Sequence, residues 1–308
     1  MIDVPRHNAN FCVAHFIEQC ERQVVKAISA FDMIGPGEKV LVAVSGGKDS
    51  LALWDLLIRL GYQAEGLYLG LGIGEYSDES GRYAMAFAEA RGLQLHQIEL
   101  RDAFGYDIPT AAARTRRVPC SACGLSKRHL FDRAAHELGA DVVATGHNLD
   151  DEAAVLFGNV LRWQTDYLAR QAPVLPAGNG FPRKIKPLVR LSEREMAAYC
   201  IVQGIDYQVE ECPMVAGNNH LAYKETLNAV EARSPGTKHD FYFGFLDRAA
   251  AALRAGMTAG AEGLASCQRC GAPTSTEVCA FCRLLDRVDG HQPDGQVAVA
   301  APVRRRSR

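Results

Sequence analysis

The stretch Lys39-Val40-Leu41-Val42-Ala43-Val44-Ser45-Gly46-Gly47-Lys48-Asp49-Ser50 decides the fold of this chain. Residues 39–44, which are apolar from Val40 onward, have the length and composition of a strand buried on both faces of a parallel sheet. Residues 45–50 then lead into a helix expected over 51–60. Two glycines let the main chain approach an anion, while hydroxyls and the N–H groups of a helix start supply donors. The pattern predicts a phosphate-binding turn; the plainer alternative is a glycine turn that only joins strand to helix.

This turn is neither of the two common nucleotide motifs. Its spacing is not that of a Walker loop, and it lacks the Gly-x-Gly-x-x-Gly fingerprint of dinucleotide-binding folds. Lys48 supplies a cation, and Asp49 could hold Mg²⁺ or orient that lysine.

Strands and helices alternate outward from this stretch. An N-terminal helix over 10–33 comes first, and strands are expected at 64–69, 94–100 and 141–145, with helices at 80–91, 121–139 and 149–163 between and after them. This alternation predicts an α/β fold with a doubly wound parallel sheet. After residue 163 we expect a loop at 171–182, a short strand at 185–189 and helices at 192–203, 221–232 and 241–254.

Composition excludes several classes of protein. The chain has 308 residues with a net charge of −2, so binding that rests on non-specific affinity for nucleic acid is not expected, and RNA contacts must come from local patches. Arg114, Arg116 and Arg117 form one candidate patch, and a second contains Arg183, Lys184, Lys186 and Arg190; either set could instead be an ordinary solvated face. No 18-residue uncharged apolar run and no secretory signal are present, so we expect a cytoplasmic protein without membrane contact.

The cysteines indicate metal or redox chemistry. Six of the ten fall in three Cys-x-x-Cys pairs, and a reducing compartment does not maintain structural disulfides. The pairs Cys267/Cys270 and Cys279/Cys282 predict a small knuckle that holds a structural Zn²⁺ through four thiolates. Rubredoxin-like iron is the alternative.

The Ser45–Ser50 hexapeptide resembles the signature of the PP-loop ATP pyrophosphatases, which cleave ATP to AMP and pyrophosphate while adenylating a carbonyl oxygen. Further stretches resemble the tRNA 2-thiolation branch of that superfamily, and within it the 2-thiouridine synthetases of the TtcA/TtuA family, over residues 10–288. These stretches are Leu71–Tyr76, Pro119-Cys120-Ser121-Ala122-Cys123-Gly124-Leu125-Ser126-Lys127-Arg128, Ala144-Thr145-Gly146-His147-Asn148-Leu149-Asp150-Asp151-Glu152-Ala153, Glu211-Cys212-Pro213 and the knuckle. The resemblance implies an adenine nucleotide α-hydrolase-like sheet.

A three-cysteine metal site follows from this resemblance. It implies that Cys120, Cys123 and Cys212 hold a 4Fe-4S cluster, and three protein ligands leave one iron open to an exogenous sulfide. A persulfide relay through the same cysteines is the competing interpretation. A further alternative has no metal or redox role: two of these cysteines are buried apolar residues and the third is unrelated to them.

The resemblance also implies the residues that bind ATP with Mg²⁺ and carry the chemistry. Lys127 and Asp151 are implied as catalytic; the bland alternative is a solvated lysine and a helix N-terminal carboxylate. The residues implied in ATP binding are Val44, Ser45, Gly46, Gly47, Lys48, Asp49, Ser50, Leu69, Gly146 and Asp151. Adenylation would turn the uracil C2 oxygen into a good leaving group, which sulfide then displaces.

The N-terminus departs from the family. Relatives carry an N-terminal zinc finger, but here only Cys12-Val13-Ala14-His15 remains. We therefore expect a degenerated finger that binds no zinc, although His7 could serve as a third ligand. The segments expected are an N-terminal helix with a finger remnant (1–36), a catalytic domain (37–258), a C-terminal zinc finger with four cysteine ligands (259–288) and a disordered basic tail (289–308).

The function implied is 2-thiolation of tRNA, at the T-loop uridine, position 54. Wobble uridine 34 and cytidine 32 stay open as target positions, as does a non-catalytic tRNA- or zinc-binding protein. By resemblance the sulfur arrives on a ubiquitin-like carrier protein as a C-terminal thiocarboxylate. Members of this family commonly form dimers, so a homodimer is a further expectation.

Overall fold

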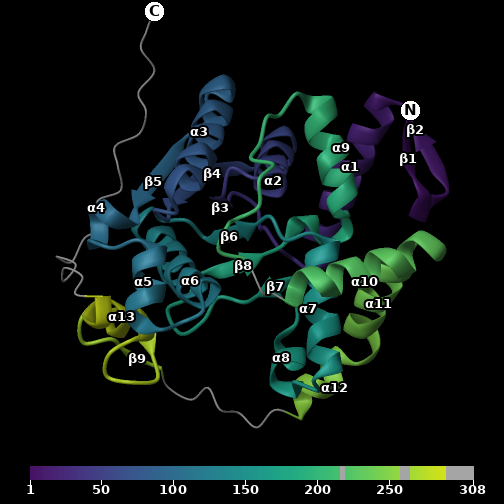
Figure 1. Ribbon diagram of the computed structural model, residues 1–308. Helices are drawn as coiled ribbons and strands as arrows, with labels where there is room; N and C mark the ends of the chain where they lie inside the picture. The colour runs from purple at the N-terminus through teal and green to yellow at the C-terminus, as the bar shows by residue number, and fades with distance from the viewer. Residues whose placement is uncertain (216–218, 257–263, 289–308) are drawn as a thin grey trace, which may run out of the picture.

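The computed structural model describes residues 1–215, 219–256 and 264–288, built around a six-stranded sheet in the order β5-β4-β3-β6-β8-β7 (Figure 1). The strands are β3 (Lys39–Val44), β4 (Gln63–Gly70), β5 (Leu95–Glu99), β6 (Val142–Thr145), β7 (Val174–Leu175) and β8 (Arg183–Ile185). All pairs are parallel except that of β7 with β8 at one edge. From β3 the chain builds β4 and β5 on one side and then β6 on the other. Ligands of open α/β sheets bind at such a switch point, beyond the carboxyl ends of the strands.

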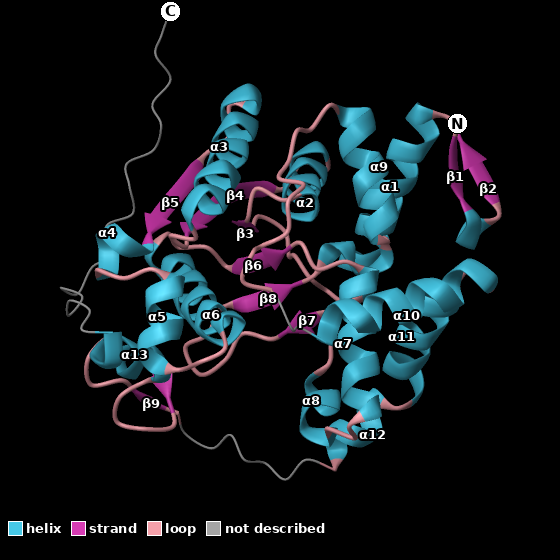
Figure 2. Ribbon diagram, in the orientation of Figure 1, coloured by secondary structure: helices cyan, strands magenta, loops and turns pink. Residues whose placement is uncertain are grey.

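Helices cover both faces of the sheet, as Figure 2 shows. Val40, Val42 and Val44 of β3 belong to one hydrophobic cluster, while Leu41 belongs to another, because successive side chains of a strand point to opposite faces. The first cluster packs α1 (Val13–Ala30), α2 (Lys48–Arg59), α3 (Gly74–Arg91) and α9 (Glu193–Gln203). The second packs α4 (Leu100–Phe104), α5 (Ile108–Thr115), α6 (Pro119–Glu137) and α13 (Ala280–Val288). The expected doubly wound sheet is confirmed.

A third group of helices packs around α7 (Leu149–Leu161). It consists of α8 (Thr165–Arg170), α10 (Asn219–Arg233), α11 (Thr237–Arg248) and α12 (Ala250–Ala255). Of these, α8, α10 and α11 contact α7 directly. In the described ranges, no helix combines the length and apolarity that crossing a bilayer needs.

Several element boundaries differ from the sequence prediction. The strand expected at 185–189 is β8 followed by a 3-10 helix, η2 (Pro187–Arg190), because Pro187 has no N–H to donate to a ladder. The helix expected over 241–254 is two helices, α11 and α12. The loop expected at 171–182 contains the short edge strand β7.

The N-terminus forms an element that the sequence did not predict. Strands β1 (Ile2–Val4) and β2 (Ala9–Phe11) pair as an antiparallel hairpin around η1 (Pro5–His7). The first helix therefore begins at Val13, with Cys12 as its N-cap, and not at residue 10. The short helices α4, α5 and α8 were also missed, because five to eight residues carry too little periodicity to recognise.

The cysteine-rich knuckle lies against α5 and α6 (Figure 1, yellow). It consists of the antiparallel strands β9 (Ala265–Ser266) and β10 (Pro273–Thr274) and of α13. Phe281 of α13 packs edge-on against Phe104 at 5.3 Å and stacks on His129 at 4.1 Å, measured between ring centroids. The tail expected at 289–308 lies outside the described residues.

Candidate active site

The glycine loop (Ser45–Ser50) closes on itself at the carboxyl end of β3. Ser45 N donates to Ser50 Oγ at 3.0 Å, and Ser50 Oγ donates to the Gly47 carbonyl at 2.9 Å. The N-cap of α2 is Gly47, which has no side chain to accept from the first N–H groups of the helix. Those groups have no intrahelical partner either, so they remain available to an anion.

Gly46 cannot be replaced without moving the loop. Its φ is +74°, and a Cβ built on it would stand 2.2 Å from the carbonyl oxygen of Ser80. Both the left-handed backbone and the close approach of α3 therefore require glycine here.

The loop that follows β6 meets the glycine loop across the switch point. A Cβ on Gly146 would stand 2.9 Å from the main chain of Asp49 and Ser50. Asn148 caps α7 in a capping box with Asp151, and its side-chain amide donates to Asp49 Oδ1 at 3.0 Å. The structure thus brings Asp49 and Asp151 to the two sides of one asparagine.

A chain of alternating charges connects the same two loops. Lys48 Nζ lies 2.7 Å from Glu193 Oε1, and Lys224 Nζ lies 3.1 Å from Glu193 Oε2. The chain ends at Asp151, whose Oδ1 is 2.6 Å from Lys224 Nζ. Sequence reasoning missed Glu193 and Lys224. The Ser192-x-x-Glu195 capping box would have put Glu193 in the first turn of a helix, but nothing local distinguishes Lys224 from other helical lysines.

The charges of this chain are mutually stabilised. Burial opposes the ionised form of Asp151, but His220 and Lys224 outweigh it and lower the pKa of that carboxyl. Burial also opposes the charge of Lys48, but Asp49 and Glu193 raise the pKa of the ammonium above its ordinary value. For Asp49 burial dominates: together with nearby Asp151 it raises the pKa of the carboxyl, against the opposing effect of Lys48.

The three cysteines predicted as cluster ligands lie in one neighbourhood. Cys120 and Cys123 occupy the first turns of α6, and Cys120 Sγ is 3.9 Å from the carbonyl oxygen of Met214, two residues after Cys212. Cys123 and Cys212 both pack against the second hydrophobic cluster. Burial raises the pKa of the Cys123 thiol, Lys127 opposes this, and Cys212 and Cys120 add to it.

These thiols are not arranged around one point. Among the described residues only the knuckle cysteines converge closely enough to bind a single ion. A cluster differs from an ion in that each cysteine ligates its own iron, which separates the sulfurs. Cys120, Cys123 and Cys212 therefore do not form a site for a lone metal ion, whereas a cluster does not need their sulfurs to converge.

Lys127 lies one helical turn after Cys123 and is partly buried. Within the described part of the chain it has no hydrogen-bond or ion-pair partner, and its charge acts on both Cys123 and His147. A cation left uncompensated between the cysteines and the loop after β6 is available to a ligand.

A main-chain contact links the glycine loop to the third cysteine. Gln208 N donates to the Gly46 carbonyl at 2.9 Å, and Gln208 forms a parallel bridge with Gly47. Cys212 follows four residues later in the chain.

The knuckle cysteines form a four-thiolate site. The Sγ atoms of Cys267, Cys270, Cys279 and Cys282 all lie within 4.8 Å of one another. The N–H of Cys279 donates to Cys267 Sγ at 3.2 Å, a contact that favours thiolate. Four converging sulfurs fit a tetrahedral Zn²⁺.

Val44 and Leu69 are buried at the ends of adjacent strands. Val44 belongs to the first cluster and Leu69 to the second, so neither side chain is free to contact a ligand. Contacts from these two positions would come from the main chain.

At the N-terminus, Cys12 Sγ and His15 Nδ1 are 3.2 Å apart on the surface. His7 Nε2 lies instead 3.3 Å from the Gln19 amide, within the fold. The degenerated finger stays a prediction.

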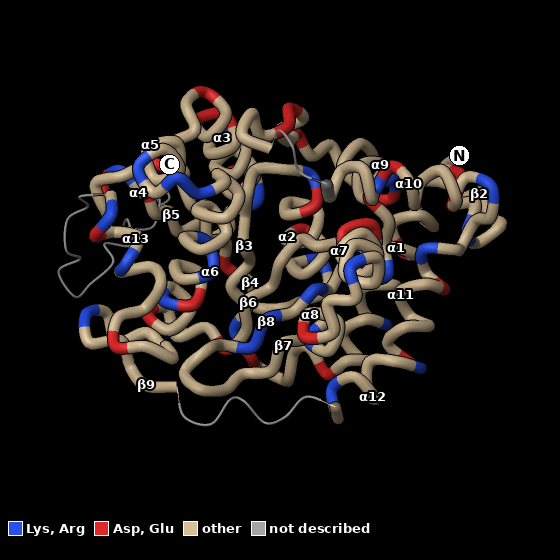
Figure 3. The backbone as a smooth tube through the Cα atoms, turned by 60° about the horizontal axis from the view of Figure 1, so that its bottom comes forward, with Lys and Arg blue, Asp and Glu red and all other residues tan. Residues whose placement is uncertain are grey.

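Three of the four basic side chains of the second patch form ion pairs within the protein. Arg183 binds Glu38, Lys184 binds Asp132 and Lys186 binds Glu152, with distances of 2.7–2.8 Å. Arg116 and Arg117, in contrast, are exposed beside α6. Figure 3 shows basic and acidic positions interspersed along the chain. Arg190, the fourth member of the second patch, contacts the Gln23 side chain and His239. The exposed cations of the first patch, Arg116 and Arg117, are therefore the better candidates for RNA contact.

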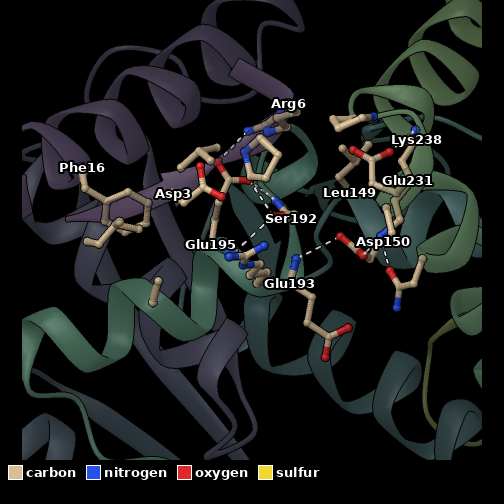
Figure 4. A pocket seen from close by; sticks show the side chains of 18 of the residues that line it. Asp3, Arg6, Phe16, Leu149, Asp150, Ser192, Glu193, Glu195, Glu231 and Lys238 are labelled. Atoms are coloured by element: carbon tan, nitrogen blue, oxygen red, sulfur yellow. Dashed lines mark hydrogen bonds and ion pairs between the residues drawn. The ribbon is translucent and has the colours of Figure 1, made fainter. Parts of the chain in front are cut away.

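A cavity of about 880 Å³ lies beside the charged chain, under the N-terminal hairpin (Figure 4). Asp150, Glu193, Glu195 and Arg6 contribute to its wall. Arg6 and Glu195 form a buried ion pair of 2.8 Å there. Sequence reasoning did not predict this cavity.

Comparisons with known proteins agree on the family. Residues 16–215 match the PP-loop domain family. The tRNA-5-methyluridine(54) 2-sulfurtransferase of Thermus thermophilus is 52% identical over 278 residues, which cover 90% of this chain and 85% of that protein. The enzyme of the same description from Pyrococcus horikoshii is 42% identical over 88% of this chain and 86% of its own. Among solved structures, the U34-tRNA thiolase NcsA from Methanococcus maripaludis with its 4Fe-4S cluster superimposes with a TM-score of 0.76, at 25% identity, over 92% of each chain.

Proposed function

Because the chain belongs to the PP-loop family, and within it to the tRNA-5-methyluridine(54) 2-sulfurtransferases, we propose that it thiolates tRNA at C2 of the T-loop uridine 54 in an ATP-dependent reaction. The identity to sulfurtransferases that act at position 54 favours this target over wobble uridine 34. The likeness to a U34 thiolase is lower in identity and supports the shared chemistry more than the position.

One observation supports the chemistry above all others. The glycine loop, Asp151 and the cysteine segment are joined by direct contacts: Asn148 to Asp49, Gln208 to Gly46 and Cys120 to Met214. A nucleotide bound at the loop would therefore lie next to the thiols, as activation followed by sulfur transfer requires.

We assign ATP to the glycine loop. The free N–H groups at the start of α2 and the ammonium of Lys48 would hold its phosphates. The main chain of Val44, Leu69 and Gly146 would line the adenosine side. The carboxylates of Asp49 and Asp151, joined through Asn148, would hold Mg²⁺ against the phosphates.

Adenylation of the uracil C2 oxygen makes AMP the leaving group. Lys127, which lacks a partner among the described residues, would stabilise the negative charge that develops during attack on C2. Asp151 stays ionised because Lys224 and His220 lower its pKa, which suits orientation of Mg²⁺ or the uracil better than proton donation. A 4Fe-4S cluster held by Cys120, Cys123 and Cys212 would supply sulfide at the iron without a protein thiolate.

The knuckle would hold Zn²⁺ and support α6, which carries two of the three cluster cysteines. A ubiquitin-like carrier with a C-terminal thiocarboxylate would deliver sulfur, a homodimer is the assembly expected, and the reaction would take place in the cytoplasm. The division of the chain at residues 36, 258 and 288 stays a prediction.

Mass spectrometry of tRNA nucleosides from a deletion strain tests the target. We expect 2-thiolation at position 54 to disappear and to return with the wild-type gene. Loss at position 34 or 32 with position 54 intact would refute the assignment.

ATP turnover tests catalysis. Purified protein should release pyrophosphate from ATP only when tRNA is present, and Lys48→Ala and Asp151→Ala should abolish that release. A protein that binds tRNA without releasing pyrophosphate would favour the non-catalytic alternative.

Iron analysis tests the cluster. Anaerobic purification should give a brown protein whose iron is lost in Cys212→Ala but kept in Cys12→Ala, which alters an exposed cysteine remote in sequence. Lys127→Met should keep the iron and lower thiolation by about 10²-fold or more, as removal of one charge-stabilising donor does elsewhere. A colourless wild-type protein with full activity would support the persulfide relay instead.

A further inference from the structure

Glu193 lies between two lysines that come from distant parts of the chain. Its Oε1 is 2.7 Å from Lys48 Nζ and its Oε2 is 3.1 Å from Lys224 Nζ. Lys48 begins α2 at the glycine loop, whereas Lys224 projects from α10. One carboxylate thus holds two ammonium groups through its two oxygens, as a phosphate group would.

The environment keeps both lysines charged. The side chain of Lys48 is 21% exposed and that of Lys224 is 17% exposed, so burial opposes both charges. Ion pairs offset this cost: Lys48 pairs with Asp49 and Glu193, and Lys224 pairs with Asp151 and Glu193. Two half-buried cations at this spacing would repel each other strongly without an anion between them. Glu193 supplies that anion.

Glu193 is the member of the chain that can leave. Its side chain is 37% exposed, against 20% for Asp151, which is also held by the capping box of α7. Figure 4 shows the Glu193 carboxylate pointing away from Asp150, to which only its main-chain N–H is bonded, at 2.9 Å. Rotation of this partly exposed side chain into solvent breaks its ion pairs with Lys48 and Lys224 and no other side-chain contact of Glu193 in the described structure. Rotamer changes of this kind take nanoseconds or less.

We propose that Lys224 is the second cation of the triphosphate site and that Glu193 occupies the place of a phosphate group between Lys224 and Lys48 until nucleotide binds. ATP would displace the carboxylate and bind both lysines through its β- and γ-phosphates. The inference rests on the proposed ATP site at the glycine loop, but not on thiolation or on the cluster.

A purely structural role for the two residues makes opposite predictions. If Lys224 only holds Asp151, its removal leaves the affinity for phosphates unchanged in the absence of Mg²⁺, because Asp151 would act on phosphates only through that ion. If Glu193 only holds Lys48 in place, its removal weakens that affinity. The sign of the change therefore separates the alternatives.

The experiment measures binding of ATP, pyrophosphate and AMP to the full-length protein by calorimetry, without Mg²⁺ and without tRNA. Lys224→Met should weaken ATP and pyrophosphate binding by about tenfold or more, the usual worth of a hydrogen bond to a charged group. Glu193→Gln should strengthen both by up to about tenfold, because the amide no longer competes for the lysines. Neither variant should change the affinity for AMP, which lacks the β- and γ-phosphates.

Lys39 provides a matched control. It forms a 2.9 Å ion pair with Glu65 at the opposite, amino end of β3, so Lys39→Met and Glu65→Gln should leave all three affinities unchanged. Lys224→Arg, which keeps the cation, should recover most of the binding.

Unchanged ATP affinity in Lys224→Met, or weaker binding in Glu193→Gln, would overturn the proposal. If Lys224→Met melts below the assay temperature, the direction of the Glu193→Gln change decides alone. A chain that binds ATP in this pattern but fails to thiolate tRNA would refute the proposed function and leave this inference standing.

Discussion

The side-chain amide of Asn148 donates a 3.0 Å hydrogen bond to the carboxylate of Asp49, 99 residues earlier in the chain. The same asparagine caps α7 by accepting from the N–H groups of Asp150 and Asp151. One side chain therefore starts a helix and fixes the contact between the loops that follow β3 and β6.

Two substitutions separate these roles of Asn148. Asn148→Ser keeps a capping oxygen but loses the amide donor, so we expect near-wild-type stability with weaker ATP binding. Asn148→Ala loses both and should cost about 1 kcal/mol more stability, the usual value of an N-cap. Thermal melts and ATP titrations check the two variants, with Ser192→Ala, the cap of α9, as a control for cap loss elsewhere. Equal ATP affinity in Asn148→Ser and wild type would contradict the expectation.

Gly46 and Gly37 allow a matched test of the glycine loop. Both have a positive φ, +74° and +76°, but a Cβ at position 37 meets nothing within 4 Å, whereas at position 46 it meets Ser80. Gly37→Ala should cost about 1–2 kcal/mol from backbone strain alone. Gly46→Ala should cost more and also abolish ATP binding, because the loop must move. Urea unfolding and nucleotide titration measure the difference, and similar behaviour of the two variants would show that the contact with Ser80 has no effect.

Asp49 should destabilise the fold at neutral pH. Burial raises the pKa of its carboxyl above the ordinary 3.8, so the folded state binds a proton more tightly than the unfolded chain does. Stability is therefore lost as the pH rises from about 3.8 through the raised folded pKa, and it then stays level. Asp49→Asn, which keeps the acceptor for Asn148, should melt higher than wild type at pH 7 and bind ATP with Mg²⁺ more weakly. The difference in melting temperature should shrink as the pH approaches 3.8; a lower melting point for Asp49→Asn at pH 7 would contradict this reasoning.

Removal of metal from the knuckle should weaken α6. Phe281, which is 1% exposed, joins α13 to Phe104 and His129, so the knuckle and α6 share one hydrophobic cluster. Zinc chelation or Cys279→Ser should lower the melting temperature and also reduce the iron retained at Cys120 and Cys123. Phe281→Ala should cost about 3–5 kcal/mol even with metal bound. Metal analysis and thermal melts check this, with exposed Cys12→Ser as the control. Full iron content after complete loss of zinc would show that the two sites are independent.

The sequence predicted those parts of the fold that depend on local pattern. The bounds of β3 are as predicted, because an apolar run followed by two glycines defines both ends of a buried strand. The hairpin of β1 and β2 was missed because three-residue strands carry no usable period. The early start of α3, at Gly74 instead of residue 80, was missed because its first turns are polar and partly exposed.

The parts of the candidate site that consist of a local sequence motif could be predicted. The parts that depend on contacts between residues far apart in the chain could not. The glycine loop and the two knuckle pairs follow from spacing alone. Glu193 and Lys224 are separated by 31 residues, and Glu193 and Lys48 by 145, so only the packing of α2, α9 and α10 brings them together. Ion pairs of that kind leave no periodic trace in a sequence, since any surface helix carries similar residues.

The hydrogen bond from Gln208 to Gly46 leaves a connection of four residues to Cys212, which spans at most about 14 Å when fully extended. The connection therefore keeps Cys212 within reach of the glycine loop, whatever path it takes. Loop insertions in an engineered variant can be placed in the surface turn near residue 178. An insertion between residues 208 and 212, in contrast, would let the third cysteine move away from the glycine loop.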